Sequence, residues 1–386
     1  YLDKLLEENE NVYSERDRHF KNLVRGFKTV NDSDFQLPSA LARVLRNYQK
    51  NGYRWLRTLE NFQFGGILAD DMGLGKTLQV IAVLLSAKQE GRKGVSLVVA
   101  PASLVFNWGE EIHKFAPELT FALISGTQEE RRRKLENYEE ADVLITSYDL
   151  LKRDAPFYEG KEFLYQVIDE AQYIKNHQTV ASKAVKVIKS QTRYALTGTP
   201  IENRLSEIWS IFDYLMPGFL YRYEVFKREI ETPIVKNQDE SAMERLKKMT
   251  APFILRRLKQ DVLKDLPEKL EETRFARMED KQQKLYDAQV LHMREVLNGQ
   301  SDENFRKNKM QVLAELMKIR QICCDPSLFL SHYSDGSAKR VACMDLIRSA
   351  MEGEHKMLVF SQFTSMLELL ERDLNAEGIS YYKITG

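Results

Sequence analysis

The chain has 386 residues, of which 43% are hydrophobic and 30% charged, so it can bury a sizeable core and is long enough for about two to three domains. Lysine plus arginine and aspartate plus glutamate each total 57, which gives a formal net charge of zero. This composition excludes an intrinsically disordered chain. It also argues against binding to nucleic acid or acidic membranes through bulk charge, although a basic surface balanced by an acidic one is compatible with it.

The cysteine content excludes a disulfide framework, because the chain has three cysteines, two of them adjacent. We expect reduced, buried thiols at Cys323, Cys324 and Cys343, as in a cytosolic protein. A metal site drawing on His332 or His355 is the alternative, but no paired C-x-x-C spacing supports it.

The terminal sequences and the hydropathy of the chain indicate its cellular compartment. No apolar run approaches the ~18 residues that a membrane span needs, and the acidic start YLDKLLEENEN is unlike a signal peptide. We expect a cytoplasmic protein if the source is bacterial or archaeal, and a nuclear one if it is eukaryotic. The chain lacks an initiator Met and stops after YYKITG, so we expect a piece of a longer protein.

From about residue 60 to 200, short apolar runs alternate with amphipathic segments of helical length. Runs such as SLVVAP and VLITSY are apolar on successive residues, as strands covered by helices on both faces require, so we predict an α/β fold with a parallel sheet. The expected strands are 66–69, 96–100, 121–124, 143–146, 166–168 and 194–197. The expected helices are 77–90, 103–115, 128–138 and 179–189.

The pattern changes after Pro217 and changes back near the carboxyl end. Residues 219–340 are charged and mostly helical in pattern, and at 356–362 a strand (KMLVFSQ), a helix ending at Gly378 as a left-handed cap, and a second strand (379–386) are predicted. The expected domains are a mostly helical extension (1–40), a first α/β lobe (41–218), a helical region (219–340) and the beginning of a second α/β lobe (341–386). The extension is either a regulatory segment or a packing element.

A phosphate-binding loop is predicted at DDMGLGKT, residues 70–77, between a strand and a helix. Glycines allow the backbone to wrap a phosphate chain, and the helix amino terminus adds a favourable dipole. Lys76 would reach the β and γ phosphates, and the Thr77 hydroxyl would ligate Mg²⁺. Asp70 stands where the strict G-x-x-x-x-G-K-[ST] pattern has its first glycine. The alternative is a glycine turn with solvated Lys and Thr.

Two further motifs follow expected strands, so they should lie on the same edge of the sheet. Asp169 would hold Mg²⁺, largely through water, and Glu170 would orient and deprotonate the attacking water. Thr197 and Thr199, in TGTP, could sense the γ-phosphate through contacts with the carboxylate strand. A solvated turn is the alternative for each motif taken alone.

The chain resembles the helicase-like region of the Swi/Snf family of DNA-dependent ATPases, within superfamily two. The motifs that carry the resemblance are LRNYQKNGYRWL (45–56), DDMGLGKT (70–77), LVVAPASLVFNW (97–108), VLITSYDLL (143–151), VIDEAQYIKN (167–176), LTGTPIENRLSEIWSIFDYLMPG (196–218), PFILRRLKQDV (252–262), MKIRQICCDP (317–326) and MLVFSQFTSMLELLE (357–371). DEAQ with YIKN and ICCDP is more similar to the bacterial or archaeal branch. PFILRR and the long GTPIEN segment separate the chain from DEAD-box RNA helicases.

The resemblance implies two RecA-like lobes of the P-loop NTPase type, with ATP in the cleft between them and duplex DNA across their face. Gln49 would read the adenine, because an amide presents a donor and an acceptor together. Gln172, together with Thr197 and Thr199, would couple ATP hydrolysis to movement. The implied nucleotide contacts also include Arg46, Gly73, Leu74, Gly75, Lys76, Thr77 and Leu78.

The resemblance also implies DNA contacts that follow the backbone and are indifferent to sequence. The candidates are Ser103, Trp108, Ser147, Tyr148 and, in the second lobe, Gln362. Trp108 has an alternative role as the core anchor of its helix.

Two basic stretches could add phosphate contacts, or could be ordinary solvated helix faces. Residues 175–193 hold five basic residues and no acid, with Lys186 and Lys189 as candidate contacts. Residues 243–264 hold seven basic residues against Glu244 and Asp261.

The predicted function is an ATP hydrolase that couples ATP hydrolysis to movement along double-stranded DNA, without strand separation. A strand-separating DNA or RNA helicase and an ATP-gated nucleic-acid-binding scaffold are the alternatives. An arginine-bearing motif of the family is missing from the chain, and an arginine finger is worth roughly 10³–10⁵ in rate, so we expect ATP binding with poor hydrolysis. Arg204, Arg256 and Arg257 belong to other motifs, and we expect them to support packing or DNA contacts.

Overall fold

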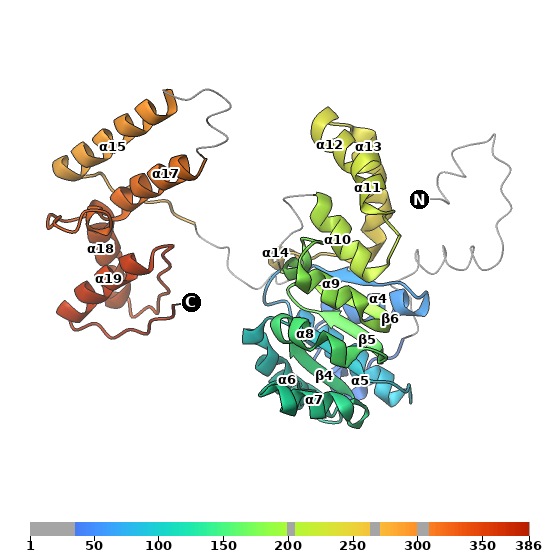
Figure 1. Cartoon of the computed structure of the whole chain (residues 1–386). Helices are drawn as coiled ribbons and strands as arrows, with labels where there is room; N and C mark the ends of the chain where they lie inside the picture. The colour runs from blue at the N-terminus through green and yellow to red at the C-terminus, as the bar shows by residue number, and fades with distance from the viewer. Residues whose placement is uncertain (1–34, 199–204, 263–270, 299–308, 386) are drawn as a thin grey trace. The chain divides into compact units, whose positions relative to one another are not determined.

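The structure, a computed structural model, describes residues 35–198, 205–262, 271–298 and 309–385 (Figure 1). The chain divides into two compact units, residues 1–268 (unit 1) and 269–386 (unit 2).

Unit 1 is built on a seven-stranded sheet in the order β3-β4-β2-β5-β6-β1-β7. Every pairing in it is parallel, for example Val98 of β2 beside Ile145 of β4 and Val167 of β5. The predicted α/β fold is therefore confirmed. The strands are β1 (Gly66–Leu68), β2 (Ser96–Ala100), β3 (Phe121–Leu123), β4 (Val143–Ser147), β5 (Glu162–Ile168), β6 (Lys189–Leu196) and β7 (Ile254–Leu255).

Two groups of helices cover this sheet. Helices α4, α5 and α6 contact one another in sequence, as do α8, α9 and α10, and α6 and α8 both lie against β4. The central strands are buried along their whole length because helices cover both of their faces. The helices are α3 (Ser39–Ala42), α4 (Asn47–Asn61), α5 (Lys76–Gln89), α6 (Val105–Phe115), α7 (Gln128–Glu136), α8 (Tyr148–Asp154), α9 (Val180–Val187) and α10 (Leu205–Leu215).

The last part of unit 1 returns to the sheet. After α11 (Tyr223–Phe226), α12 (Thr232–Asn237) and α13 (Glu240–Thr250), the chain forms β7 beside β1 and then α14 (Lys259–Val262). The sequence did not predict β7, because two residues are too short to carry a strand pattern. This edge strand places the PFILRR segment next to the glycine loop, since the Ala69 N–H donates to the Leu255 carbonyl at 2.7 Å.

Unit 2 is helical where the structure describes it. It contains α15 (Asp280–Asn298), α17 (Lys309–Cys324), α18 (Ala338–Glu352) and α19 (Thr364–Ala376), and α15 packs against α17 (Figure 1). A small apolar cluster of Met344, Ile347, Met366 and Leu370 joins α18 to α19. Gly378 has φ of +70° directly after α19, which confirms the predicted left-handed cap.

The two strands predicted in unit 2 are wrong for this structure. Residues 356–362 and 379–385 have no strand pairing, and Leu358 and Phe360 are 85% and 87% exposed. A strand needs a neighbour to satisfy its backbone hydrogen bonds, and the described residues of unit 2 supply none.

No helix in the described part of the chain is long and apolar enough to cross a membrane.

Candidate functional site

The glycine loop between β1 and α5 forms a cradle with little room for side chains. Gly73 and Gly75 have φ of +84° and +71°, the left-handed region that favours glycine. A Cβ on Gly75 would lie 2.4 Å from the Gln49 amide nitrogen. The loop leads directly into α5, whose first N–H groups have no intrahelical acceptor and can therefore bind an anion.

Gln49 fixes one wall of this cradle. Its amide oxygen accepts from the Arg46 N–H at 2.8 Å, and its amide nitrogen donates to the Leu74 carbonyl at 3.1 Å. The Tyr48 hydroxyl donates to the same carbonyl at 3.1 Å. The amide therefore keeps one N–H and one lone pair for a further partner, as a role in reading a base requires. The Leu74 and Leu78 side chains are buried, so these two residues can contact a nucleotide at the loop through their backbone groups.

Asp70 forms a buried ion pair where a strict phosphate-loop motif has glycine. Its carboxylate is fully buried and accepts from the Arg257 guanidinium through Nε at 2.8 Å and through a second nitrogen. Arg257 also donates to the Tyr48 carbonyl and, at 2.7 Å, to the Gln79 side chain, and its guanidinium lies over the Tyr48 ring. This pair ties β7 to the loop and to α4. Arg257 therefore supports packing, which is one of the two roles expected for it.

Lys76 lies between the loop and the carboxylates. Its ammonium donates to the Asp70 carbonyl at 2.7 Å, and a Cβ on Gly198 would lie 3.4 Å from it. Burial lowers the pKa of Lys76, and the nearby carboxylates of Glu170 and Asp169 oppose this shift. A cation held among acids at a glycine loop is suited to bridging phosphate oxygens.

The carboxyl ends of β5 and β6 bring three of the predicted residues together. The Gln172 amide donates to the Glu170 carboxylate at 2.6 Å and accepts from the Thr197 hydroxyl at 3.2 Å. Glu170 is held in the left-handed region, with φ of +50°. Gln172 thus links the DEAQ and TGTP motifs through its two ends. Thr199 lies outside the described residues, as do Pro200 and Arg204.

Asp169 is anchored by two side chains that were predicted to contact DNA. The Trp108 indole donates to its carboxylate at 2.9 Å, and the Tyr148 hydroxyl donates to its carbonyl at 2.7 Å. Burial raises the pKa of Asp169, and the hydrogen bond from Trp108 opposes this shift. Trp108 and Tyr148 are only 1% and 3% exposed. We therefore correct the two predicted DNA contacts, because both side chains point into unit 1; the alternative reading of Trp108 as a core anchor agrees with the structure.

Other predicted DNA contacts divide between the surface and the interior. Ser103, directly after β2, is exposed, as is Gln362 in unit 2, whose side chain accepts from Arg320. Ser147 is buried and caps α8, accepting from the Leu150 N–H at 3.2 Å.

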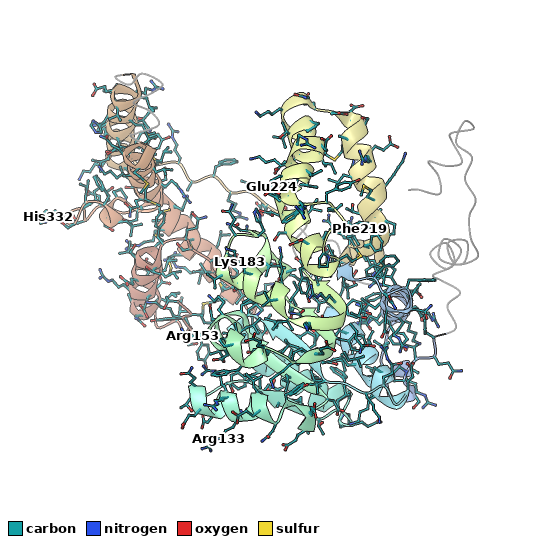
Figure 2. The ribbon with its side chains drawn as sticks, turned by 45° about the vertical axis from the view of Figure 1, so that its right-hand side comes forward. Arg133, Arg153, Lys183, Phe219, Glu224 and His332 are labelled. Carbon is teal, nitrogen blue, oxygen red and sulfur yellow. The ribbon has the colours of Figure 1, made fainter. Side chains whose placement is uncertain are left out.

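The basic stretch 175–193 is only partly a surface. The Lys186 ammonium is 2.8 Å from the Asp213 carboxylate, and burial lowers the pKa of Lys186. Lys186 is therefore a packing residue, which corrects its predicted role, whereas Lys189 is exposed at the start of β6. Lys183, labelled in Figure 2, is also exposed on α9.

The stretch 243–264 is similarly divided. Arg257 is partly buried and pairs with Asp70, and Lys248 lies 2.8 Å from Glu244. Arg245 donates to the Tyr221 hydroxyl at 2.9 Å. These contacts reduce the basic surface that the sequence count suggested.

The residues present fit a magnesium-bound nucleotide. Asp169, whose carboxylate acts on the nearby Lys76, and Thr77, the second residue of α5, offer a carboxylate and a hydroxyl, and Mg²⁺ takes much of its coordination from water and phosphate oxygens. Among the described residues, no group of three or more His, Cys, Asp or Glu lies close enough together to hold a metal ion. Cys323, Cys324 and Cys343 are free and partly buried.

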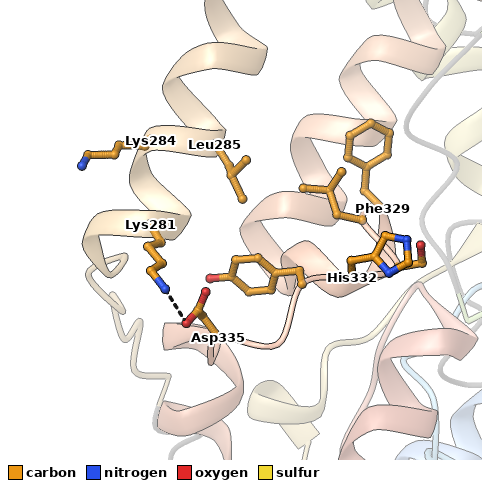
Figure 3. A pocket seen from close by; sticks show the side chains of 9 residues that line it. Lys281, Lys284, Leu285, Phe329, His332 and Asp335 are labelled. Carbon is orange, nitrogen blue, oxygen red and sulfur yellow. Dashed lines mark hydrogen bonds and ion pairs between the residues drawn. The ribbon is translucent and has the colours of Figure 1, made fainter.

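Unit 2 contains a separate cavity of about 560 Å³. Leu285 and Phe329 form apolar walls, and the Lys281 ammonium pairs with Asp335 at 2.8 Å at its rim (Figure 3). Apart from His332, the candidate for the alternative metal site, no predicted site residue lines this cavity.

The sequence is similar to those of known proteins. Residues 48–328 match the family model described as the SNF2-related domain. An uncharacterized ATP-dependent helicase of Mycoplasma genitalium is 39% identical over 348 residues, which are 89% of this chain and 32% of that protein. The putative ATP-dependent helicase/translocase YwqA of Bacillus subtilis is 36% identical over 92% of this chain and 39% of its own length. The chain thus spans between 32% and 39% of the length of these curated relatives.

A solved structure is similar as well. The SWI2/SNF2 ATPase core of Sulfolobus solfataricus in complex with dsDNA is 40% identical, with a TM-score of 0.56, covering 86% of this chain and 70% of that one. The bacterial and archaeal matches agree with the branch that the DEAQ and ICCDP motifs indicated.

Proposed function

Because the chain belongs to the SNF2-related family of helicase-like ATPases, we propose that it is the motor part of an ATP-driven translocase on double-stranded DNA. The observation that carries this proposal is the network at the sheet edge, where Gln172 joins the Glu170 carboxylate to the Thr197 hydroxyl near Lys76. We propose residues 41–218 as the ATP-binding lobe, 219–340 as the helical region and 341–386 as the beginning of the second lobe, with β7 of the helical region adding an edge strand to the sheet of the first lobe.

The proposed chemistry is hydrolysis of the terminal phosphate of ATP. Lys76 and the N–H groups that open α5 bind the β and γ phosphates. Asp169 and Thr77 hold Mg²⁺, which when bound offsets the charge of these phosphates. Glu170 accepts the proton of the attacking water, and the Gln172 amide, 2.6 Å from one carboxylate oxygen, leaves the other oxygen for that water.

Double-stranded DNA is the proposed partner, supported by the DNA-bound state of the similar archaeal core. Ser103, Lys189 and Gln362 are the predicted contacts that the structure leaves exposed. Contacts of this kind address phosphates, so we propose binding without sequence preference and with strong dependence on salt.

A Glu170→Gln variant tests the chemistry. It should keep the affinity for ATP and lose about 10²- to 10⁴-fold in turnover, because the amide cannot accept the proton. Retained turnover would exclude Glu170 as the base. Binding and hydrolysis are measured separately, so a loss of turnover can be distinguished from a loss of ATP affinity.

Movement along DNA needs a second assay. Displacement of a third strand from a DNA triplex, without separation of a duplex, is the expected result for the protein. Duplex separation would favour the helicase function that the names of its relatives carry. ATP-dependent binding with neither outcome would favour a scaffold.

A further inference from the structure

We propose that Trp108 and Tyr148 are positioning residues for Asp169, which fix its carboxylate where it holds Mg²⁺ and connect it to the protein surface. This inference rests on the proposed function and adds two residues to it.

The contact from Trp108 is a hydrogen bond between a buried donor and a buried carboxylate. The indole N–H donates to Asp169 Oδ2 at 2.9 Å, and the Glu170 N–H donates to Oδ1 at 2.8 Å. Each oxygen of Asp169 therefore has a fixed donor. The indole N–H is the sole polar group of the Trp108 ring, so its contribution can be removed by substitution with phenylalanine.

Tyr148 holds the main chain at the same residue. Its hydroxyl donates to the Asp169 carbonyl at 2.7 Å, and the Asp169 N–H donates to the Val99 carbonyl at 2.8 Å. The carboxylate therefore projects from a backbone that is fixed on both sides. Partners of this kind set the orientation of a metal ligand.

Both positioning residues belong to elements that reach the surface. Trp108 lies on α6, whose Phe106 is 63% exposed. The Tyr148 ring stacks on Tyr173 with centroids 4.9 Å apart and planes 5° from parallel, and Tyr173 is 51% exposed. A ligand bound over Tyr173 would thus contact a ring that stacks on Tyr148, whose hydroxyl bonds Asp169.

The chain provides matched controls for both residues. Trp209 donates its indole N–H to the Tyr221 carbonyl at 3.1 Å, and Tyr214 donates its hydroxyl to the Gln166 carbonyl at 2.9 Å. Both are buried, as the two positioning residues are. Trp209→Phe and Tyr214→Phe therefore remove an equivalent buried donor without touching Asp169.

The test is the affinity of the full chain for ATPγS, measured by calorimetry with Mg²⁺ and with EDTA. Trp108→Phe should reduce the gain in affinity that Mg²⁺ provides by about tenfold, and Tyr148→Phe by a smaller factor. Both should leave the affinity in EDTA unchanged, and the two controls should leave both values unchanged. In an Asp169→Asn background, Trp108→Phe should cause no further loss.

The outcomes separate the two proposals. If the wild-type chain gains no affinity from Mg²⁺, the proposed function fails, and this inference fails with it. If the wild type gains affinity and Trp108→Phe behaves as Trp209→Phe does, the inference alone is overturned.

A measurement on the unsubstituted chain covers the case in which Trp108→Phe does not fold. The indole ¹⁵N–H signals of Trp55, Trp108 and Trp209 can be assigned by elimination from the Trp55→Phe and Trp209→Phe spectra. Adding Mg²⁺ to the ATPγS complex should shift the Trp108 signal and leave the other two in place. An unmoved Trp108 signal would overturn the inference.

Discussion

Similar apolar segments have different structures in units 1 and 2. In unit 1 the run EFLYQVI forms β5 between β2 and β6, and its Phe163 is 1% exposed. In unit 2 the run KMLVFSQ has no strand neighbour, and its Phe360 is 87% exposed. An apolar run thus supplies the side chains of a strand, but adjacent strands supply the backbone partners that make it one.

The largest expected effect uses these two phenylalanines as a pair. Phe163→Ala should lower the free energy of unfolding of unit 1 by about 4 kcal/mol, because it leaves a cavity beside the rings of Tyr138 and Tyr158. Phe360→Ala should change stability by at most about 0.5 kcal/mol. Denaturant titration of both variants measures this. Equal losses would mean that Phe360 is buried in solution.

The buried ion pair of unit 1 should have the next largest effect. Arg257→Ala should cost about 3 kcal/mol, because it leaves the Asp70 carboxylate buried without its partner. In unit 2, Arg348 and Glu377 pair at 2.7 Å with both side chains substantially exposed, so Arg348→Ala should leave the unfolding midpoint unchanged. A midpoint for Arg257→Ala equal to that of the wild type would contradict the role assigned to this pair.

Ligand binding should distinguish the two units. At 100 times the dissociation constant, Mg²⁺ with ATPγS should stabilise unit 1 by about 2.7 kcal/mol. Amide hydrogen exchange should therefore slow along β1 and α5, and not along α18 and α19. Removing Mg²⁺ with EDTA should reduce the effect, and Lys76→Ala should abolish it. Protection confined to unit 2 would place the nucleotide elsewhere.

The smallest expected effect concerns DNA. Lys189→Gln should reduce the slope of log affinity against log salt by about one, with a several-fold loss of affinity, if its ammonium contacts a phosphate. Gln362→Ala removes no charge and should leave the slope unchanged. Fluorescence anisotropy with duplex DNA at several salt concentrations measures both. An unaltered slope for Lys189→Gln would remove this residue from the interface.

Much of unit 1 could be predicted because its signals are local. The strand at 96–100 is found where it was predicted, and the contact of Thr197 with the carboxylate strand is present through Gln172. Strand ends were less certain: β6 begins at Lys189, where a helix was expected to end, and α9 ends at Val187.

The contacts that could not be predicted join distant segments. Nothing in the residues around Asp70 indicates that Arg257, 187 positions away, neutralises it. The motif that contains Trp108 allows either a DNA contact or a core anchor, and the charge run that contains Lys186 indicates the surface, whereas Asp169 and Asp213 bond these two side chains within unit 1. The direction of a side chain depends on the residue that it contacts in the folded protein, and the pattern of residues along the sequence does not identify that residue.

The same ion pair has a consequence for the order in which the protein is made. The glycine loop leaves the ribosome long before Arg257 does, and at roughly 5–20 residues per second the delay is about 10 to 40 seconds. During that interval Asp70 has no guanidinium partner, and β1 has no β7 on its outer edge. We therefore expect a nascent chain that ends before residue 254 to hold a six-stranded sheet whose phosphate loop is not yet locked, and the ability to bind nucleotide to arrive late in synthesis.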